Sequence, residues 1–187
     1  MSETHIYNIR GTNGSGKTTF VRTILDQMGG GPIGWRGPKR NKVEAYAGEY
    51  KGKSIVILGS YEAACGGMDT VTDINDRVDM IHTYANKGYD IMLLEGLMMS
   101  HAIGRMGEAM KLYKHTLAFL DTPLEKCIDR VIARRHEKGN YEEFDPKNVV
   151  KDHHAVSLCY KNCIKQGLPA IMIDHNATME AFFNACY

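Results

Sequence analysis

The sequence predicts an α/β domain with a mainly parallel sheet of five strands and helices on both of its faces. Short apolar segments alternate along the chain with longer segments in which apolar residues recur at helical spacing. The segments 55–58 and 91–94 are apolar throughout, which is typical of strands buried in a parallel sheet. A glycine-rich loop separates the first strand from the first helix, and α/β sheets bind ligands at that end of their strands.

Composition limits the classes of protein to which the chain can belong. It has 187 residues, of which 43% are hydrophobic and 24% charged, so we expect one ordinary globular domain over 1–187. The net charge of +1 indicates that any contact with nucleic acid comes from local basic patches. No signal-peptide pattern is visible, and no apolar run approaches the ~20 residues of a membrane span. We therefore expect a cytoplasmic protein without a membrane segment.

The five cysteines contain no C-x-x-C pair, which argues against a disulfide framework or a zinc ribbon. Cys159 and Cys163 are four residues apart and follow His153 and His154, so a metal site is one interpretation of this segment. Cysteines that pack in the core are the favoured interpretation.

The first half of the chain contains one segment with two interpretations. Gly29-Gly30-Gly31-Pro32 is a strong helix stop, and the basic segment 35–42 that follows is expected to be a solvated loop. Alternatively, Trp35, Arg36 and Arg40 contact a polyanionic substrate by stacking and by charge. The elements expected here are the strand 5–10, the helix 17–28, a β-hairpin of 43–50 and 53–58, an irregular loop over 61–72, and a helix over 73–86 capped by Thr72 or Asp73.

The second half continues the alternation of strands and helices. A strand at 90–94 closes on Glu95-Gly96, and a strand at 116–120 ends at Asp121. The remaining elements expected are the helix 98–112, a charged helix over 123–138, a polar loop over 139–148, the helix 149–166, a last strand at 169–173 and a short tail helix.

Residues 11–18, GTNGSGKT, match the phosphate-binding pattern G-x-x-x-x-G-K-[ST]. The glycines permit a tight curl that points peptide N–H groups at phosphate oxygens, and the following helix adds its positive end. Lys17 suits the β- and γ-phosphates, and the Thr18 hydroxyl suits Mg²⁺. An ordinary glycine-rich turn is the alternative, which the flanking strand and helix disfavour. We expect ATP and Mg²⁺ as cofactors, with ATP contacts from Asn13, Gly14, Ser15, Gly16, Lys17, Thr18 and Thr19.

Two acidic residues follow apolar strands and are candidates for catalysis. Glu95 ends a strand expected beside the phosphate-binding loop, where a carboxylate holds Mg²⁺ or orients a nucleophile; a solvent-facing strand end is the alternative. Asp69 follows Gly66 and Gly67, whose flexible backbone lets a substrate approach closely. We expect Asp69 to accept the proton of an acceptor hydroxyl, and a glycine turn with a helix-capping Asp is the alternative.

Tyr61 and Gly67 are expected to contact the substrate. The Tyr61 ring can stack on a base or donate a hydrogen bond to it, although a packing tyrosine is nearly as well supported. Gly67 lies in the segment that carries Asp69.

Three arginines lie within two turns of the helix 123–138. Arginine neutralises the charge of a transferring phosphoryl group, so Arg130 and Arg134 are expected at the ATP site, with exposed arginines on a solvated helix as the alternative. Arg134 and Arg135 point in different directions on a helix and are not expected to serve one site. Asn176, after the last strand, is a candidate contact for the nucleotide base.

Taken together, Gly11–Thr18, the strand ending at Glu95, the segment 120–125 leading into Arg130–Arg135 and the loop after 139 resemble the nucleoside and nucleotide kinases among P-loop proteins. The resemblance covers most of the chain. It implies a three-layer P-loop kinase fold with a small β-hairpin and an arginine-bearing lid at about 134–150 that covers ATP.

A second resemblance is more specific. The segment Gly59-x-Tyr61 with Gly66-Gly67-x-Asp69 is similar to phage kinases that phosphorylate 5-hydroxymethyluracil in DNA, a step towards hypermodified thymine. It implies that Asp69 serves the acceptor hydroxyl and that DNA containing a hydroxymethylated pyrimidine is the partner. The chain departs from ordinary nucleoside kinases, because Ser60-Tyr61 stands where their acidic base follows the second main strand.

Three functions are therefore compatible with the sequence. The first is an ATP-dependent kinase that phosphorylates the hydroxymethyl group of 5-hydroxymethyluracil in phage DNA. The second is a kinase of a free nucleoside or nucleoside monophosphate, and the third is a P-loop NTPase that transfers no phosphate. The type of acceptor pocket discriminates among them.

Overall fold

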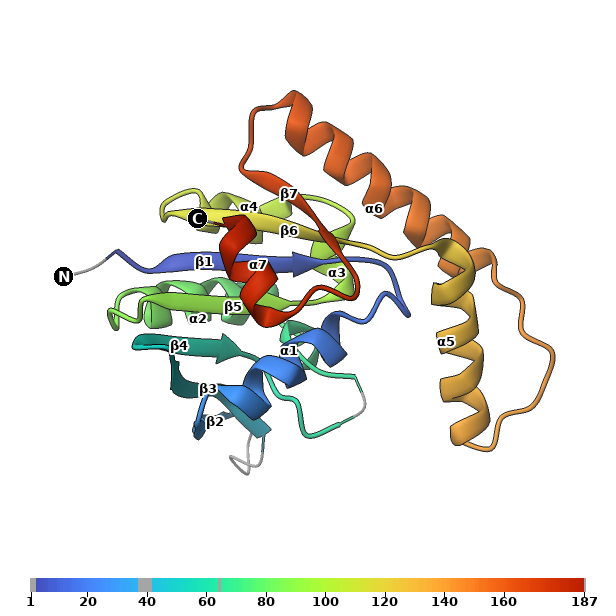
Figure 1. Cartoon of the computed structure of the whole chain (residues 1–187), viewed down its shortest axis with the longest axis horizontal. Coiled ribbons are helices and arrows are strands. Elements are labelled where there is room, and N and C mark those ends of the chain that lie inside the picture. The colour runs from blue at the N-terminus through green and yellow to red at the C-terminus, as the bar shows by residue number, and fades with distance from the viewer. Residues whose placement is uncertain (1–2, 37–41, 64, 187) are drawn as a thin grey trace.

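The computed structural model describes residues 3–36, 42–63 and 65–186, which form a seven-stranded sheet flanked by helices (Figure 1). Most elements lie where the sequence predicts them. Their bounds are β1 His5–Arg10, α1 Lys17–Gln27, β2 Gly30–Arg36, β3 Lys42–Tyr50, β4 Lys53–Leu58, the short 3₁₀ helix η1 Met68–Thr70, α2 Ile74–Ala85, β5 Ile91–Glu95, α3 Leu97–Ser100, α4 Gly104–Met110, β6 His115–Asp121, α5 Leu124–Glu137, α6 Lys147–Lys165, β7 Ala170–Asp174 and α7 Met179–Cys186.

The strand order β2-β3-β4-β5-β1-β6-β7 places β1 near the centre of the sheet. The strands β4, β5, β1, β6 and β7 are parallel to one another, whereas β3 is antiparallel to both of its neighbours, β2 and β4. The prediction of a five-stranded sheet was therefore wrong. The hairpin predicted over 43–50 and 53–58 forms as β3 and β4, but it is part of the same sheet, and β2 adds a further strand at its edge. β1 and β5 end side by side, which brings the loops after both strands to one edge.

The strand β2 was the element that sequence reasoning missed. The helix stop at 29–32 was expected to lead into a solvated loop, but Gly30–Arg36 pairs with β3. Gly30 lies opposite Gly48, and a Cβ on Gly30 would stand 2.1 Å from the Ala47 carbonyl oxygen. Two glycines thus let the backbones pair closely, and an edge strand tolerates Pro32.

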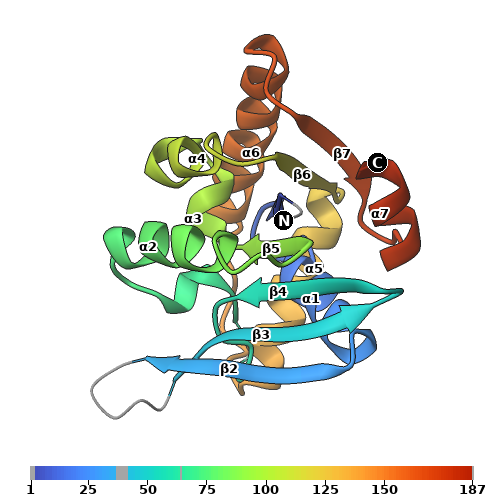
Figure 2. The same cartoon turned by 90° about the vertical axis from the view of Figure 1, so that its left-hand side faces the viewer.

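Both faces of the sheet are covered, as Figure 2 shows. Side chains alternate along each strand, so Val56 and Leu58 of β4 pack with α2, α4 and α6 in one core cluster. Ile55 and Ile57 pack with α1 and α7 in the other. This three-layer arrangement holds the carboxyl ends of the parallel strands rigidly in place.

The single helix expected over 98–112 is instead two short helices, α3 and α4. Arg10 is fully buried at the end of β1, and its Nη1 donates to the carbonyl oxygen of Ala102 at 3.1 Å. This carbonyl lies between the two helices, and Gly104 at the start of α4 has a φ of 53°. We attribute the break between α3 and α4 to these two features: the Ala102 carbonyl oxygen accepts a hydrogen bond from Arg10, and Gly104 turns the chain.

Two further expectations can be compared with the described residues. No helix within 3–36, 42–63 and 65–186 has the length and apolar character needed to cross a membrane. Over the same ranges, no group of three or more His, Cys, Asp or Glu side chains could hold a metal ion. Cys159 and Cys163 are buried in the core, as the packing interpretation of these cysteines predicts.

A buried histidine lies in the central strand. His5 is 6% exposed, its ring stacks on Tyr7, and its Nε2 lies 2.9 Å from the Thr116 hydroxyl. Burial, with a smaller contribution from the charges of Lys114 and His115, lowers the pKa of His5 from 6.5 to about 4. The His5 ring of the folded protein therefore binds a proton more weakly than the same ring does in the unfolded chain.

We expect His5 to make the fold less stable in acid. Above pH 6.5 His5 is neutral in both the folded and the unfolded chain, and its contribution to the free energy of unfolding is complete. As the pH falls, the unfolded chain takes up the proton first, so this contribution is about 2 kcal/mol smaller at pH 5 and is lost as the pH falls through 4. His5→Gln keeps a polar group beside Thr116 but does not titrate. Urea unfolding at pH 7 and pH 5 should show a smaller loss of stability for the variant. An equal loss in both proteins would contradict the assignment.

Candidate functional site

The phosphate-binding loop curls between β1 and α1 and leaves the peptide N–H groups at the start of α1 free. Gly14 and Gly16 have φ values of 79° and 99°, which L side chains rarely adopt. Within the described part of the chain, the N–H groups of Gly16, Lys17, Thr18 and Thr19 donate to no carbonyl oxygen. Four free donors at the start of α1 form the anion-binding arrangement that the sequence predicts.

The Lys17 ammonium group lies inside this loop. The residue is 7% exposed, and its Nζ donates to the carbonyl oxygens of Gly11 at 2.8 Å and Thr12 at 3.0 Å. Burial lowers the pKa of Lys17, while the nearby carboxylates of Glu95 and Asp69 act in the opposite direction. A phosphate group would replace the two neutral carbonyls by a charged partner for this ammonium.

Glu95 ends β5 next to the phosphate-binding loop, as expected. It is 1% exposed, and its Oε1 accepts a hydrogen bond from the Thr18 hydroxyl at 2.9 Å. Burial raises the pKa of Glu95 to about 7, although Lys17 and the Thr18 hydrogen bond favour the charged carboxylate. The alternative of a solvent-facing strand end is excluded by this burial.

The loop after β4 is folded back tightly upon itself. The Gly67 N–H donates to the Ser60 carbonyl oxygen at 2.9 Å, and the Thr70 hydroxyl donates to the Gly67 carbonyl oxygen at 2.7 Å. A Cβ on Gly59 would stand 2.2 Å from the Gly67 backbone, and a Cβ on Gly67 would stand 2.7 Å from Glu95 Oε1. Glycine at both positions is therefore required for the loop to reach Glu95.

This loop brings Asp69 to the end of β5. Asp69 is exposed in η1, and its Oδ2 accepts a hydrogen bond from the Leu97 N–H at 2.7 Å. Its Oδ1 would lie 2.8 Å from a Cβ on Gly96, directly after Glu95. The structure thus brings Lys17, Glu95 and Asp69 from three separate segments into one site, with Asp69 at its open side.

Arg22 is a site residue that sequence reasoning missed. Its guanidinium Nη2 donates to the carbonyl oxygen of Tyr61 at 3.0 Å and also to that of Ala63. The side chain thus ties α1 to the loop that carries Asp69. A signal was available, because Arg22 lies four residues after Thr18 and so on the same helical face.

Tyr61 is buried beside this loop, with 7% of its surface exposed. Its ring packs edge-to-face on Tyr46 at 5.9 Å, and burial raises the pKa of its phenol well above 10. The phenol oxygen has no hydrogen-bond partner among the described residues. The packing interpretation describes this ring, and a contact with substrate stays a prediction.

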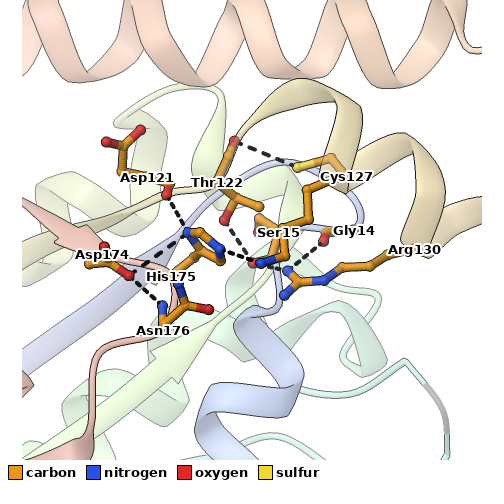
Figure 3. A network of polar contacts seen from close by, with 10 residues as sticks. Gly14, Ser15, Asp121, Thr122, Cys127, Arg130, Asp174, His175 and Asn176 are labelled. Carbon is orange, nitrogen blue, oxygen red and sulfur yellow. Dashed lines mark hydrogen bonds and ion pairs between the residues drawn. The ribbon is translucent and has the colours of Figure 1, made fainter.

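Two of the three arginines of α5 reach the phosphate-binding loop, and Figure 3 shows the contact that Arg130 makes. Arg130 Nη1 donates to the carbonyl oxygens of Gly14 at 3.2 Å and Ser15 at 3.1 Å. Arg134 Nη2 donates to Asn13 Oδ1 at 2.7 Å. Arg135 instead donates to Asn140 at 3.0 Å, so it points away from its neighbour Arg134, as the helical geometry predicts.

The remaining candidates lie further away or outside the described residues. Asn176 follows β7, its N–H donates to Asp174 at 2.7 Å, and its side chain is exposed near the start of α5 (Figure 3). The backbone of Arg36 ends β2, but its side chain lies outside the described residues, as does all of Arg40. Their roles stay predictions.

The residues present fit a magnesium nucleotide. The loop offers free N–H donors and an ammonium group, and the hydroxyls of Thr12 and Ser15 are buried without partners among the described residues. Thr18 and Glu95 place two hard oxygen ligands within 2.9 Å of each other, which is the donor chemistry that Mg²⁺ prefers.

Gly67→Ala should abolish activity at this site. The added Cβ would lie 2.6 Å from the Glu95 carbonyl oxygen, and the alanine backbone would have to keep a φ of 74°. We therefore expect the free energy of unfolding to fall by about 1–3 kcal/mol. Gly52→Ala is the matched control, because Gly52 has a φ of 75° but no atom within 4 Å of an added Cβ. It should cost about 1 kcal/mol and leave the activity intact. Thermal unfolding and a kinase assay measure both effects, and an active Gly67→Ala enzyme would refute the role of this close approach.

Comparison with known proteins gives consistent results. No protein-family model matches the sequence. A protein named 5-hmdU DNA kinase from Pseudomonas phage PaMx11 is 31% identical over 97% of this chain and 96% of its own length. A second protein of that name, from Pseudomonas phage M6, is 32% identical over 86% of each chain.

A solved structure supports the fold alone. A chain from the PezAT toxin–antitoxin system of Streptococcus pneumoniae superposes with a TM-score of 0.53 at 13% identity, covering 95% of this chain and 71% of that one. The phage relatives carry the assignment, because their identity extends over nearly the whole sequence. The chain belongs to the family of 5-hmdU DNA kinases.

Proposed function

We propose that the protein transfers the γ-phosphate of ATP to the hydroxymethyl group of 5-hydroxymethyluracil in DNA. The observation that carries this proposal is the position of Asp69, an exposed carboxylate at the open side of a site that contains Lys17, Thr18 and Glu95. The names of the phage relatives indicate the acceptor. A phage enzyme of this kind would act in the host cytoplasm.

The phosphate-binding side of the reaction uses the donors already described. The free N–H groups at the start of α1 and the Lys17 ammonium bind the β- and γ-phosphates and stabilise the charge that develops on them. Thr18 and Glu95 hold Mg²⁺, which neutralises phosphate oxygens when bound. Arg130 and Arg134 reach the same loop from α5 and add positive charge.

The acceptor side depends on Asp69. The acceptor hydroxyl oxygen forms a bond to the γ-phosphorus, the bond from that phosphorus to the β–γ bridging oxygen breaks, and ADP leaves. Asp69 accepts the hydroxyl proton through the carboxylate that the Leu97 N–H orients. A base that reacts within DNA must leave the stack or come from a single strand, and an exposed carboxylate suits such an acceptor.

An acceptor comparison tests the function directly. With ATP labelled at the γ-phosphate, we expect transfer to an oligonucleotide containing 5-hydroxymethyluracil and none to the same oligonucleotide with thymine. Lys17→Ala should abolish transfer, because the loop loses its charge for the triphosphate. Label in the free nucleoside but not in the polymer would establish the nucleoside-kinase alternative, and ATP hydrolysis without transfer would establish the NTPase alternative.

Asp69→Asn should lower kcat for transfer by about 100-fold or more, because the amide cannot accept the proton. The Asn oxygen can still accept the Leu97 hydrogen bond, so the fold and the affinity for ATP should not change. Asp73→Asn is the control, since this exposed residue caps α2 and Asn caps helices equally well. Steady-state kinetics and ATP titrations measure the effects; near-normal kcat in Asp69→Asn would remove Asp69 from the reaction.

A further inference from the structure

A pocket of about 300 Å³ lies between α5 and α6, beside the phosphate-binding loop, which contributes Asn13 to its lining. Figure 1 shows α5 beyond the ends of the parallel strands, with α6 beginning next to it and running back along the sheet. The residues that line the pocket come from the loop, from both helices and from the segment joining them: Asn13, Val131, Arg134, Arg135, Lys138, Phe144, Asn148, Val149 and Asp152.

One wall of this pocket comes from α5 and the residue after it, and no acidic side chain of the described residues neutralises its positive charge. Arg134, Arg135 and Lys138 contribute three cations, and none makes an ion pair with an acid in the described part of the chain. The one acid in the lining, Asp152, lies 3.5 Å from His101 Nε2. Arg135 is held by Asn140 and by the Phe144 ring, whose centroid is 5.2 Å away. Lys138 is exposed, and its ammonium group makes no hydrogen bond or ion pair within the described ranges.

The position of the pocket connects it to both substrates. Arg134 lines it and donates to Asn13 of the phosphate-binding loop at 2.7 Å. The same guanidinium lies 3.9 Å from the sulfur of Cys65, in the loop that carries Asp69. A strand whose reacting base lies at Asp69 therefore has the pocket within reach across Arg134.

The size and chemistry of the pocket favour one nucleotide unit. Its volume is at the lower end of small-molecule sites, which is too small for a complete ATP. The three cations and the two amides, from Asn13 and Asn148, suit a phosphate, and the apolar side chains of the lining suit a sugar or a base.

We propose that this pocket binds a backbone phosphate of the acceptor DNA strand, next to the nucleotide that is phosphorylated. The inference rests on the proposed function and adds the place where the polymer is held. It explains how a protein with a net charge of +1 can bind a polyanion, since the cations concentrate in the lid. It also distinguishes a polymer from a free nucleoside, which has no neighbouring phosphate to place there.

Two variants remove the predicted affinity without altering the ATP site. Lys138→Gln deletes a cation whose ammonium group makes no hydrogen bond or ion pair with the described residues. Asn148→Asp places a negative charge in the pocket, in the first turn of α6, where an acid is compatible with the helix dipole. Lys165→Gln, in the last turn of α6 and outside the pocket, is the control for net charge.

The dissociation constant for a single-stranded oligonucleotide containing 5-hydroxymethyluracil is measured by fluorescence anisotropy at several salt concentrations. We expect each pocket variant to bind about 5–20-fold more weakly, and Lys138→Gln to lower the slope of log K against log salt by about 0.7. Lys165→Gln should bind like the wild type, and all variants should bind ATP normally.

Three results would overturn the inference: normal DNA affinity in both pocket variants, an equal loss in Lys165→Gln, or a parallel loss of ATP affinity, which would assign the pocket to the ATP phosphates. Each is distinct from failure of the proposed function, in which the wild type transfers no label to hydroxymethylated DNA. A wild type that phosphorylates this DNA while both pocket variants bind it normally would disprove only the pocket.

Discussion

The burial of the Lys17 ammonium is the interaction on which the rest of the site depends. A cation that is 7% exposed needs partners, and here two carbonyl oxygens of its own loop supply them. The loop must curl to present those carbonyls, and the same curl leaves the N–H groups at the start of α1 free. Glu95 stands close enough to support the cation, but its own burial raises its pKa to about 7. The buried ammonium is therefore only partly balanced by nearby negative charge, and the proposed triphosphate would complete that balance.

The second constraint is how closely backbones approach around Glu95. Gly59, Gly67 and Gly96 each lie where a Cβ would be under 3.0 Å from another segment. These approaches place η1 against the end of β5. Asp69 and Glu95 therefore share one site, although they lie in different elements of the fold. Arg22 fixes the same loop from α1. The Asp69 carboxylate is thus positioned by backbone packing and by the Leu97 N–H, and the residue stays exposed.

The arginines of α5 make contacts on two different sides of the helix. Arg130 and Arg134 point at the phosphate-binding loop, whereas Arg135 holds the segment between α5 and α6 through Asn140 and Phe144. This division leaves a positively charged pocket beside the loop, separate from the carbonyls that Arg130 contacts. Arg134 borders both the phosphate-binding loop and the pocket, whereas Arg135 and Lys138 line the pocket without contacting the loop.

The local pattern of the sequence determined the phosphate-binding loop, the strand and helix around it and most later elements, because curl, periodicity and capping act between residues close in the chain. It also placed Glu95 at a strand end and Asp69 in a glycine loop. Only the tertiary structure decided that β2 joins the sheet, since its glycines looked like a turn until they met Gly48 across the strands. Likewise, the buried Arg10 divides α3 from α4, and Arg22 meets the Tyr61 carbonyl, through contacts between residues 39 or more positions apart. Such contacts depend on which segments the whole sheet brings together, and no local pattern specifies that.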